Sequence, residues 1–359
     1  MRLVFVTQRI DPDDAVLGAT VAKVRALAER CEEVVVLADG AVPGVLPPNC
    51  RVRLFAAPSR PWRGLRFARA LAAELLRPPR PVAVVAHMCP VYAVLAAPLV
   101  KPLRVRNVLW YTHWKRTRTL AAAAWLCDAV ASVDVRSVPL SSPKVRAIGH
   151  GIDVSRLECG EGSGRDPLTA LALGRYSAAK GLEWIVRAVG ILRTRGIDVA
   201  LRCHGMAATP AEEADRRALV ALVAELGLED AVEVGGPVSH AEVPELLRSV
   251  DVLVNNMRAG ATDKVVYEAC ASCLPVVVSN PLFAELVAGL EPRLLFAREA
   301  PADLADRLGA LASLAAAERR ALGAELRSRV VARHSVGHWA DELIRLCREP
   351  QGRPSSASR

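Results

Sequence analysis

Basic and acidic residues stand where apolar runs end in the second half of the sequence. Arg175 and Lys180 flank a glycine-containing turn after a run of strand length, and Lys264 and Glu268 are four positions apart in a segment with helical spacing. Cations beside the free N–H groups at the start of a helix are suited to phosphate. The turn is not a Walker loop, because the GxxxxGK[ST] spacing is absent. The pattern predicts a diphosphate site. The competing interpretation is that Arg175 and Lys180 simply face solvent.

The stretch 259–279, AGATDKVVYEACASCLPVVVS, is central to this prediction. It follows the apolar run 251–254 and leads through a glycine-containing loop into a helix expected over 265–272. In a doubly wound α/β sheet, the loop after a strand and the start of the next helix form the usual ligand crevice. Here that crevice would contain Asp263, Lys264 and Glu268.

Strands and helices alternate along the whole chain. The expected strands cover residues 1–7, 34–38, 51–56, 82–86, 105–111, 129–133, 145–148, 168–173, 199–203, 232–234, 251–254 and 276–278. The expected helices cover residues 18–30, 65–76, 91–99, 120–127, 181–193, 211–226, 241–250, 265–272, 302–333 and 336–347. This alternation predicts an α/β protein with mostly parallel sheets covered on both faces.

A glycine-rich linker at 158–167 divides the chain. We expect a first domain over 1–160 and a second over 161–333, followed by a separate helix at 334–347 and a disordered tail over 348–359. The 359 residues are enough for two ordinary domains, each with its own core.

The composition is that of a globular protein, with 52% hydrophobic and 24% charged residues. The longest apolar runs, 91–100 and 120–133, are shorter than the roughly 20 residues a membrane-spanning helix needs. Residues 1–19 lack a signal-peptide pattern. Nine scattered cysteines do not indicate a disulfide framework, and Cys270-Ala-Ser-Cys273 is interpreted as small core residues rather than a redox motif. We therefore expect a cytoplasmic protein.

The formal net charge of +9 is concentrated in the first half. Arginine dominates residues 51–80, where Glu74 is the one acid, and residues 101–118 are basic without any acid. Such a surface could contact the anionic inner face of a membrane, although an ordinary solvated surface is an equal alternative. Nucleic acid is disfavoured as a partner, since aromatic residues make up 4% of the chain and no binding module is present.

Taken in order, the segments IGHGIDV (148–154), GRYSAAKG (174–181), VGGPVSHAEVPELLRSVDVLV (234–254) and DKVVYEACASCLPVVVS (263–279) resemble the retaining GT-B glycosyltransferases of glycosyltransferase family 4. The resemblance covers nearly all of the chain. It implies two Rossmann-like domains facing across a cleft. The second would hold a nucleoside-diphosphate sugar and the first an acceptor such as a lipid-linked or cell-envelope glycan. The C-terminal helix would pack back on the first domain.

The resemblance also implies roles for single residues. Arg175 and Lys180 would hold the donor diphosphate and stabilise the leaving nucleotide, while Glu268 would bind the ribose. His113 would lie beside the sugar and, with Arg175 and Lys180, complete the catalytic group. The remaining donor-binding residues would be Gly18, Gly174, Gly236, Pro237, Asp263, Lys264 and Val265. The implied activity is a retaining hexosyltransferase that needs neither a metal nor a cofactor.

One departure from the family pattern leaves alternatives open. The family commonly has a Glu eight positions before the one at Glu268, and this chain has Gly260 there. The protein could therefore be a catalytically silent relative that acts as a binding partner. A GT-B epimerase would need further acids and histidines around the sugar, and an NAD dehydrogenase is disfavoured because no GxGxxG follows a first strand. The donor base, the sugar and the acceptor are left open.

Overall fold

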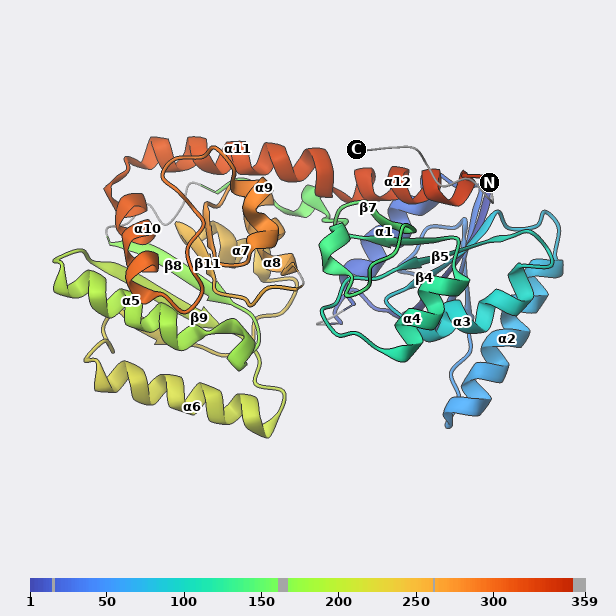
Figure 1. Ribbon diagram of the computed structural model, residues 1–359, viewed down its shortest axis with the longest axis horizontal. Helices are drawn as coiled ribbons and strands as arrows, with labels where there is room; N and C mark the ends of the chain where they lie inside the picture. The colour runs from blue at the N-terminus through green and yellow to red at the C-terminus, as the bar shows by residue number, and fades with distance from the viewer. Residues whose placement is uncertain (15–16, 161–166, 261, 351–359) are drawn as a thin grey trace. The chain divides into compact units, whose positions relative to one another are not determined.

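The computed structural model describes residues 1–14, 17–160, 167–260 and 262–350. It consists of two compact units. Unit 1 comprises Met1–Asp153 and the chain from Arg333 onward, and unit 2 comprises Val154–Ala332 (Figure 1). Most of the predicted linker, 161–166, and the tail from 351 lie outside the described residues.

Unit 1 contains a seven-stranded parallel sheet with the order β3-β2-β1-β4-β5-β6-β7. The strands are β1 (Arg2–Ile10), β2 (Glu33–Ala41), β3 (Cys50–Leu54), β4 (Ala83–His87), β5 (Arg106–Trp110), β6 (Ala129–Ser132) and β7 (Val145–Ala147). The central strands β1, β4 and β5 are almost entirely buried, as expected for a parallel sheet covered on both faces. The parallel α/β class predicted from the sequence is confirmed.

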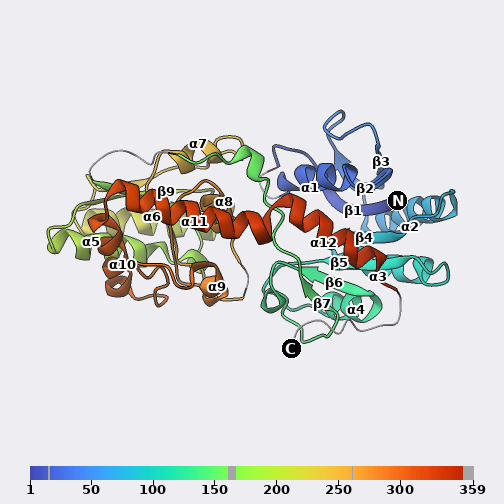
Figure 2. The same ribbon diagram turned by 90° about the horizontal axis from the view of Figure 1, so that it is seen from above.

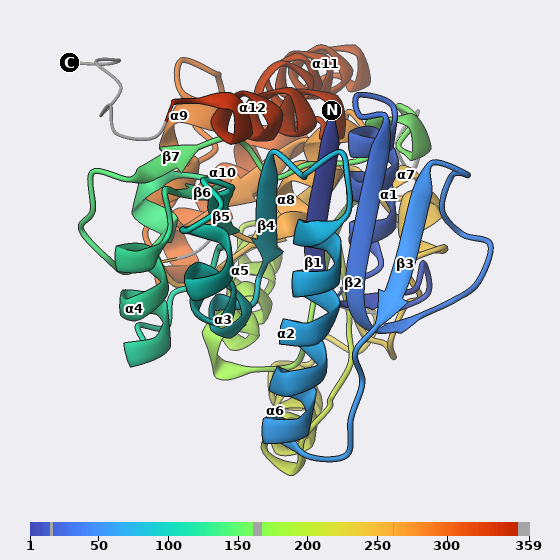
Figure 3. The same cartoon turned by 90° about the vertical axis from the view of Figure 1, so that its right-hand side faces the viewer.

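Helices cover both faces of this sheet. One layer consists of α2 (Arg60–Leu76), α3 (Pro90–Val100) and α4 (Arg118–Leu126), which pack side by side (Figure 3). The other face carries α1 (Ala19–Ala28) and α12 (Val336–Arg348), which contact each other. Ser335 caps α12 by accepting a hydrogen bond from the backbone N–H of His338 at 3.3 Å.

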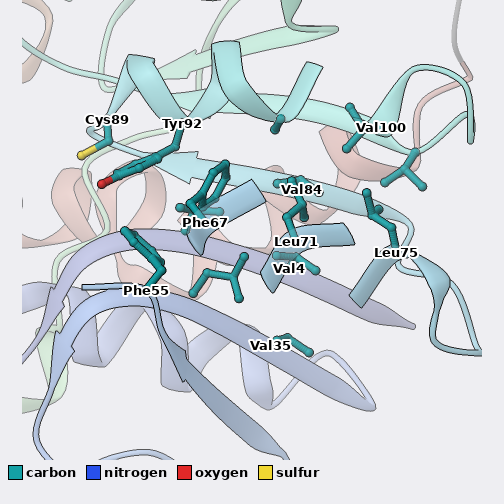
Figure 4. Packing of buried hydrophobic residues seen from close by; sticks show 14 residues of the cluster. Val4, Val35, Phe55, Phe67, Leu71, Leu75, Val84, Cys89, Tyr92 and Val100 are labelled. Atoms are coloured by element: carbon teal, nitrogen blue, oxygen red, sulfur yellow. The ribbon is translucent and has the colours of Figure 1, made fainter. Parts of the chain in front are cut away.

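The core beneath α2 and α3 is aromatic at its centre (Figure 4). Phe67 of α2 lies 4.8 Å from Tyr92 of α3 and 5.5 Å from Phe55, measured between ring centroids. Val4, Val35 and nearby aliphatic side chains of the sheet fill the space below these rings. This packing fixes one side of α2 and directs its other side to solvent.

Several arginines of the basic stretch 51–80 are paired with one buried acid. Glu74 is fully buried, and its carboxylate is ion-paired with Arg2, Arg51 and Arg53. Arg77 lies 3.8 Å from the same carboxylate. A buried carboxylate is stable only when it is paired, so these arginines serve the fold. The exposed basic surface is therefore smaller than the charge count indicates.

Unit 2 contains a five-stranded parallel sheet with the order β10-β9-β8-β11-β12. The strands are β8 (Leu168–Leu173), β9 (Val199–His204), β10 (Val232–Val234), β11 (Val252–Asn255) and β12 (Val276–Val278). Its helices are α5 (Leu182–Thr194), α6 (Pro210–Glu225), α7 (Val243–Arg248), α8 (Lys264–Ala271), α9 (Ala284–Val287), α10 (Pro301–Ser313) and α11 (Ala316–His334). Among the helices of the described residues, none is long and apolar enough to cross a membrane.

The predicted single helix over 302–333 is wrong, because the structure divides it into α10 and α11. The break occurs at Leu314, whose ψ of 144° is not helical, and the Glu318 carboxylate accepts a hydrogen bond from Ala315 N at 2.8 Å to begin α11. The long α11 then runs across unit 2 (Figure 2). Arg329 of α11 donates hydrogen bonds to the carbonyls of Leu286 and Ala288.

The interpretation of Cys273 as a small core residue is wrong, because Cys273 forms a disulfide. Cys159 is disulfide-bonded to Cys273, 114 positions away, with a Cα–Cα distance of 4.9 Å. Cys273 therefore pairs outside its CxxC segment, while Cys270 is free and buried. Spacing could not reveal this bond, since it depends on the chain after unit 1 passing the end of α8. Arg327 of α11 links the same two segments, because its guanidinium donates hydrogen bonds to the carbonyls of Leu157 and Ala271.

Candidate functional site

The turn after β8 is shaped by two glycines that allow close approach. Gly174 has φ +139°, and a Cβ on it would lie 2.5 Å from Nζ of Lys180, so the lysine side chain folds back over the glycine. A Cβ on Gly205 would lie 1.7 Å from the carbonyl oxygen of Gly174. At Gly205 a side chain would displace the backbone, and at Gly174 the positive φ strains any residue other than glycine. The turn therefore holds the ammonium group of Lys180 at the carboxyl end of β8.

Lys180 is paired with the carboxylate that begins α8. Its ammonium forms an ion pair with Asp263 and lies 3.4 Å from the carbonyl oxygen of Leu173. Asn255, at the end of β11, donates a hydrogen bond to the same Asp263 oxygen at 2.9 Å. Burial alone would raise the pKa of Asp263, but the charge and hydrogen bond of Lys180, together with Asn255, hold it below its ordinary value. Asp263 is therefore ionised at neutral pH.

The other predicted cation of the turn has a different partner. The guanidinium of Arg175 is 63% exposed and lies 3.3 Å from the Glu212 carboxylate of α6. The second carboxylate oxygen of Glu212 accepts a hydrogen bond from Ala208 N at 2.7 Å. Arg175 thus points toward α6 while Lys180 points toward α8. The two do not share an anion in this structure.

The first turns of α8 carry the second predicted pair. Nζ of Lys264 lies 2.9 Å from a carboxylate oxygen of Glu268, one helical turn further on, and Val265 is buried. The loop before α8 contains Gly260 with φ +114°, a conformation that side chains with L chirality rarely adopt. An acid at this position would be strained in the present loop.

The segment after β10 combines one closely packed glycine with one open glycine. A Cβ on Gly235 would lie 2.4 Å from the His204 ring, whereas nothing lies within 4 Å of a Cβ on Gly236. The backbone beside Pro237 is thus open to a ligand. The carbonyl oxygen of Gly236 accepts a hydrogen bond from Gly205 N at 3.0 Å, which ties this segment to the end of β9.

Residues that the sequence interpretation passed over also support the site. The buried Tyr176 hydroxyl lies 2.9 Å from the Cys203 carbonyl oxygen and 2.7 Å from that of Gly235, and burial raises its pKa to about 12. Asn256 donates a hydrogen bond to the carbonyl of Gly181 at 2.9 Å. The Asn-Asn pair after a buried strand was a usable signal, because polar side chains at strand ends mark the ligand edge of a parallel sheet.

Two predicted residues belong to unit 1. His113 follows β5, and its Nδ1 accepts a hydrogen bond from Lys115 N at 3.0 Å. In the neutral imidazole the proton then sits on Nε2, which becomes a donor. Gly18 precedes α1 with φ −52°, an ordinary helical value, and its N–H bonds to the Asp14 carbonyl at 2.9 Å.

Within the part of the chain that the structure describes, no cluster of His, Cys, Asp and Glu could hold a metal ion. A cavity of about 400 Å³ opens at the opposite, amino-terminal ends of β8 and β11, lined partly by Asp251, Arg248 and Arg319. It contains none of the predicted site residues. The candidate site is therefore the carboxyl edge of the unit 2 sheet.

Solved structures with this architecture cover nearly the whole chain. Sucrose-phosphate synthase from Thermosynechococcus elongatus is 18% identical with a TM-score of 0.73, and 97% of this chain and 98% of that chain are covered. HepE of Anabaena, in complex with UDP and glucose, is 17% identical with a TM-score of 0.74 and coverages of 96% and 98%. A glycosyltransferase from Rickettsia africae is 12% identical with a TM-score of 0.75 and coverages of 96% and 97%. The fold is GT-B.

Unit 2 of this GT-B chain has the more specific match. Residues 167–313 match the family described as Glycosyl transferases group 1. The matched segment begins just before β8 and ends with α10, so it contains Lys180, Asp263 and Glu268. Among curated proteins, none matches the chain.

Proposed function

We propose that the protein is a retaining glycosyltransferase that moves a hexosyl group from a nucleoside-diphosphate sugar to an acceptor without a metal ion. The observation that carries the proposal is the position of Lys180. Its ammonium is held by Gly174 at the carboxyl edge of a parallel sheet, beside the first turn of α8. The match of this segment to Glycosyl transferases group 1 supports the same reaction.

In this proposal the diphosphate of the donor takes the place of Asp263 beside Lys180. Departure of the nucleoside diphosphate builds negative charge on its phosphate oxygens. A cation already in place stabilises that charge more in the transition state than in the ground state. Arg175 is exposed and lies 3.3 Å from the Glu212 carboxylate. In this proposal its side chain leaves Glu212 and contacts the same phosphates.

The remaining donor contacts follow from the geometry of α8 and the open glycine. The Glu268 carboxylate, one turn into α8, accepts hydrogen bonds from the ribose hydroxyls. Lys264 and Val265 line the start of the helix. The base lies against the backbone at Gly236 and Pro237, where no side chain intervenes. We take UDP as the first donor nucleotide to test, because the HepE structures hold UDP and UDP-glucose.

Unit 1 supplies the acceptor side. His113 donates a hydrogen bond from Nε2 to the sugar, and the absence of a side chain at Gly18 lets the donor phosphates approach the backbone before α1. The acceptor is a lipid-linked or cell-envelope glycan, reached from the inner face of the membrane. The basic character of the first half of the chain supports this choice.

The second candidate is a binding protein without catalytic activity. Gly260 favours it, because the loop conformation suits glycine and supplies no carboxylate to the sugar. In addition, Lys180, Arg175 and Lys264 are each neutralised by a carboxylate. The transferase requires nucleotide-sugar binding and turnover, whereas the silent relative acts as a binding partner without turnover.

Two measurements separate the candidates. In a thermal-shift series with UDP-, GDP- and ADP-sugars, a ligand at 100 times its Kd adds about 2.7 kcal/mol of stability. The nucleotide sugar that binds is then incubated with a membrane extract, and nucleotide release is measured. Release identifies the transferase, while binding without release identifies the silent relative. Absence of binding by all common nucleotide sugars contradicts the transferase.

A further inference from the structure

Helix α2 has two apolar sides, and only one of them is used by the core. Phe67, Leu71 and Leu75 point into unit 1 and are buried. The opposite side is a single exposed stripe at helical spacing, which we call the α2 stripe; it consists of Trp62, Leu65, Arg66, Arg69, Ala73 and Leu76. The stripe extends along about 21 Å of helix at 1.5 Å per residue.

The apolar side chains of the α2 stripe are unusually exposed. Trp62 is 63% exposed, Leu65 48% and Leu76 74%. Exposure of a tryptophan and two leucines to water is unfavourable, and burial of these side chains against an apolar partner would stabilise the protein. Scattered single apolar residues need no explanation, but a repeated row on one helix does.

The charge on the same face has one sign. Glu74 is the one acid of α2, and it is buried on the inner side among arginines. The stripe therefore presents Arg66 and Arg69 without an exposed carboxylate on α2. The neighbouring helix α4 continues the pattern: its Trp125 is 76% exposed, and Nζ of Lys101, just after α3, lies 5.4 Å from the Trp125 ring centroid.

We propose that the outer face of the α2, α3 and α4 layer, centred on the α2 stripe, binds the surface of an anionic phospholipid membrane. A helix with Trp and Leu interleaved with Arg suits the boundary between headgroups and acyl chains. There the apolar side chains leave water while the guanidinium groups contact lipid phosphates. Because the α2 stripe runs along the helix axis, α2 lies parallel to the membrane surface in this proposal.

A membrane matches these observations better than a protein partner. The centre of a protein interface is depleted in charge, whereas two arginines lie in the middle of the α2 stripe. The proposal deepens the membrane contact of the proposed function by naming its surface. Because vesicle binding is measured without donor or acceptor, it succeeds or fails independently of glycosyl transfer.

The test is co-sedimentation of the full chain with two kinds of vesicle, phosphatidylcholine alone and phosphatidylcholine mixed with phosphatidylglycerol. The wild type is expected to bind only the mixed vesicles, and less tightly as salt is added. Arg66→Gln with Arg69→Gln should weaken binding roughly 25-fold, at about fivefold for each basic residue. Trp62→Ser with Leu65→Ser should weaken it roughly tenfold or more.

A matched control uses α6, another long surface helix. Arg217→Gln with Val220→Ser removes an exposed arginine and a 48% exposed valine there, and should bind vesicles as the wild type does. Thermal unfolding checks that every variant folds, as expected for exposed positions. Equal binding of both vesicle types by the wild type, or unchanged binding by both α2 variants, overturns the proposal. Self-association of the wild type in vesicle-free solution that the α2 variants lose also overturns it, because the stripe then contacts a second copy.

Discussion

The Lys180 ammonium and the Asp263 carboxylate, 83 positions apart in the sequence, form an ion pair at the carboxyl edge of the unit 2 sheet. Their side chains are only 14% and 19% exposed. The pair links the turn after β8 to the start of α8, and Asn255 of β11 completes it. In the proposed reaction, a donor diphosphate competes with Asp263 for the same cation.

Removing the cation should lower both turnover and stability. Lys180→Ala is expected to lower the rate of nucleotide release at least ~10²-fold, the scale for losing one charge-stabilising group. It should also lower the melting temperature, because the partly buried Asp263 carboxylate loses its partner. Steady-state assays and thermal unfolding measure the two effects.

The double variant Lys180→Met with Asp263→Asn is the control for the unpaired Asp263 carboxylate that Lys180→Ala leaves. It should recover most of the stability, since both charges are removed together, but none of the turnover. Turnover that returns with stability contradicts a direct role of Lys180 in the reaction.

Gly205 and Gly236, whose backbones are joined by a hydrogen bond, should respond differently to an added methyl group. Gly236→Ala meets no atom within 4 Å, so its melting temperature should equal that of the wild type. A methyl group between backbone and base should nevertheless weaken UDP binding roughly tenfold, measured by calorimetry. Gly205→Ala, whose Cβ would lie 1.7 Å from the Gly174 carbonyl oxygen, should destabilise the fold. Unchanged UDP affinity in Gly236→Ala would place the base elsewhere.

The Cys159–Cys273 disulfide should stabilise unit 2. It closes a long loop across 114 positions, for which about 2–4 kcal/mol of stabilisation is typical. Urea unfolding with and without dithiothreitol should show this difference in the wild type and none in Cys159→Ser. Under denaturing conditions, seven thiols should react without reductant and nine with it. Nine reactive thiols without reductant would show that the bond does not form.

Unit 1 should lose stability on mild acidification because of His87. Burial, assisted by the Lys23 ammonium, holds the pKa of His87 well below the usual 6.5. The folded state therefore keeps His87 neutral while the unfolded chain takes up a proton below about pH 6.5. Stability should fall by about 1.4 kcal/mol per pH unit for this one proton as the pH drops below that value, until the folded pKa is reached.

Urea unfolding between pH 7 and about pH 5 measures this slope. His87→Phe keeps an aromatic ring on Trp110, which the imidazole stacks against at 4.9 Å, and should remove the His87 share of the slope. The share of His334, whose pKa burial lowers to about 4, should remain in the variant. An unchanged slope in His87→Phe would show that His87 does not take up the proton.

The alternation of strands and helices was readable from the sequence because each element carries its own period of apolar residues. Parallel strands bring their carboxyl ends to one edge, so the sequence alone indicates that the turn at Gly174 and the helix start at Lys264 lie at that edge. The parallel sheets followed from the same local signals, whereas the GT-B fold was implied by the resemblance of the ordered motifs to a known family.

The partners of the charged residues were decided only by tertiary structure. The sequence put Lys180 and Arg175 in one turn, but the fold turns them to Asp263 and Glu212 on different helices. The sequence likewise did not show which arginines pair with Glu74, that Cys159 bonds to Cys273, or that one side of α2 is exposed. The physical reason is common to all of them. Ion pairs, disulfides and solvent exposure depend on which atoms come within a few ångströms across long stretches of chain, and a local sequence pattern does not contain that distance.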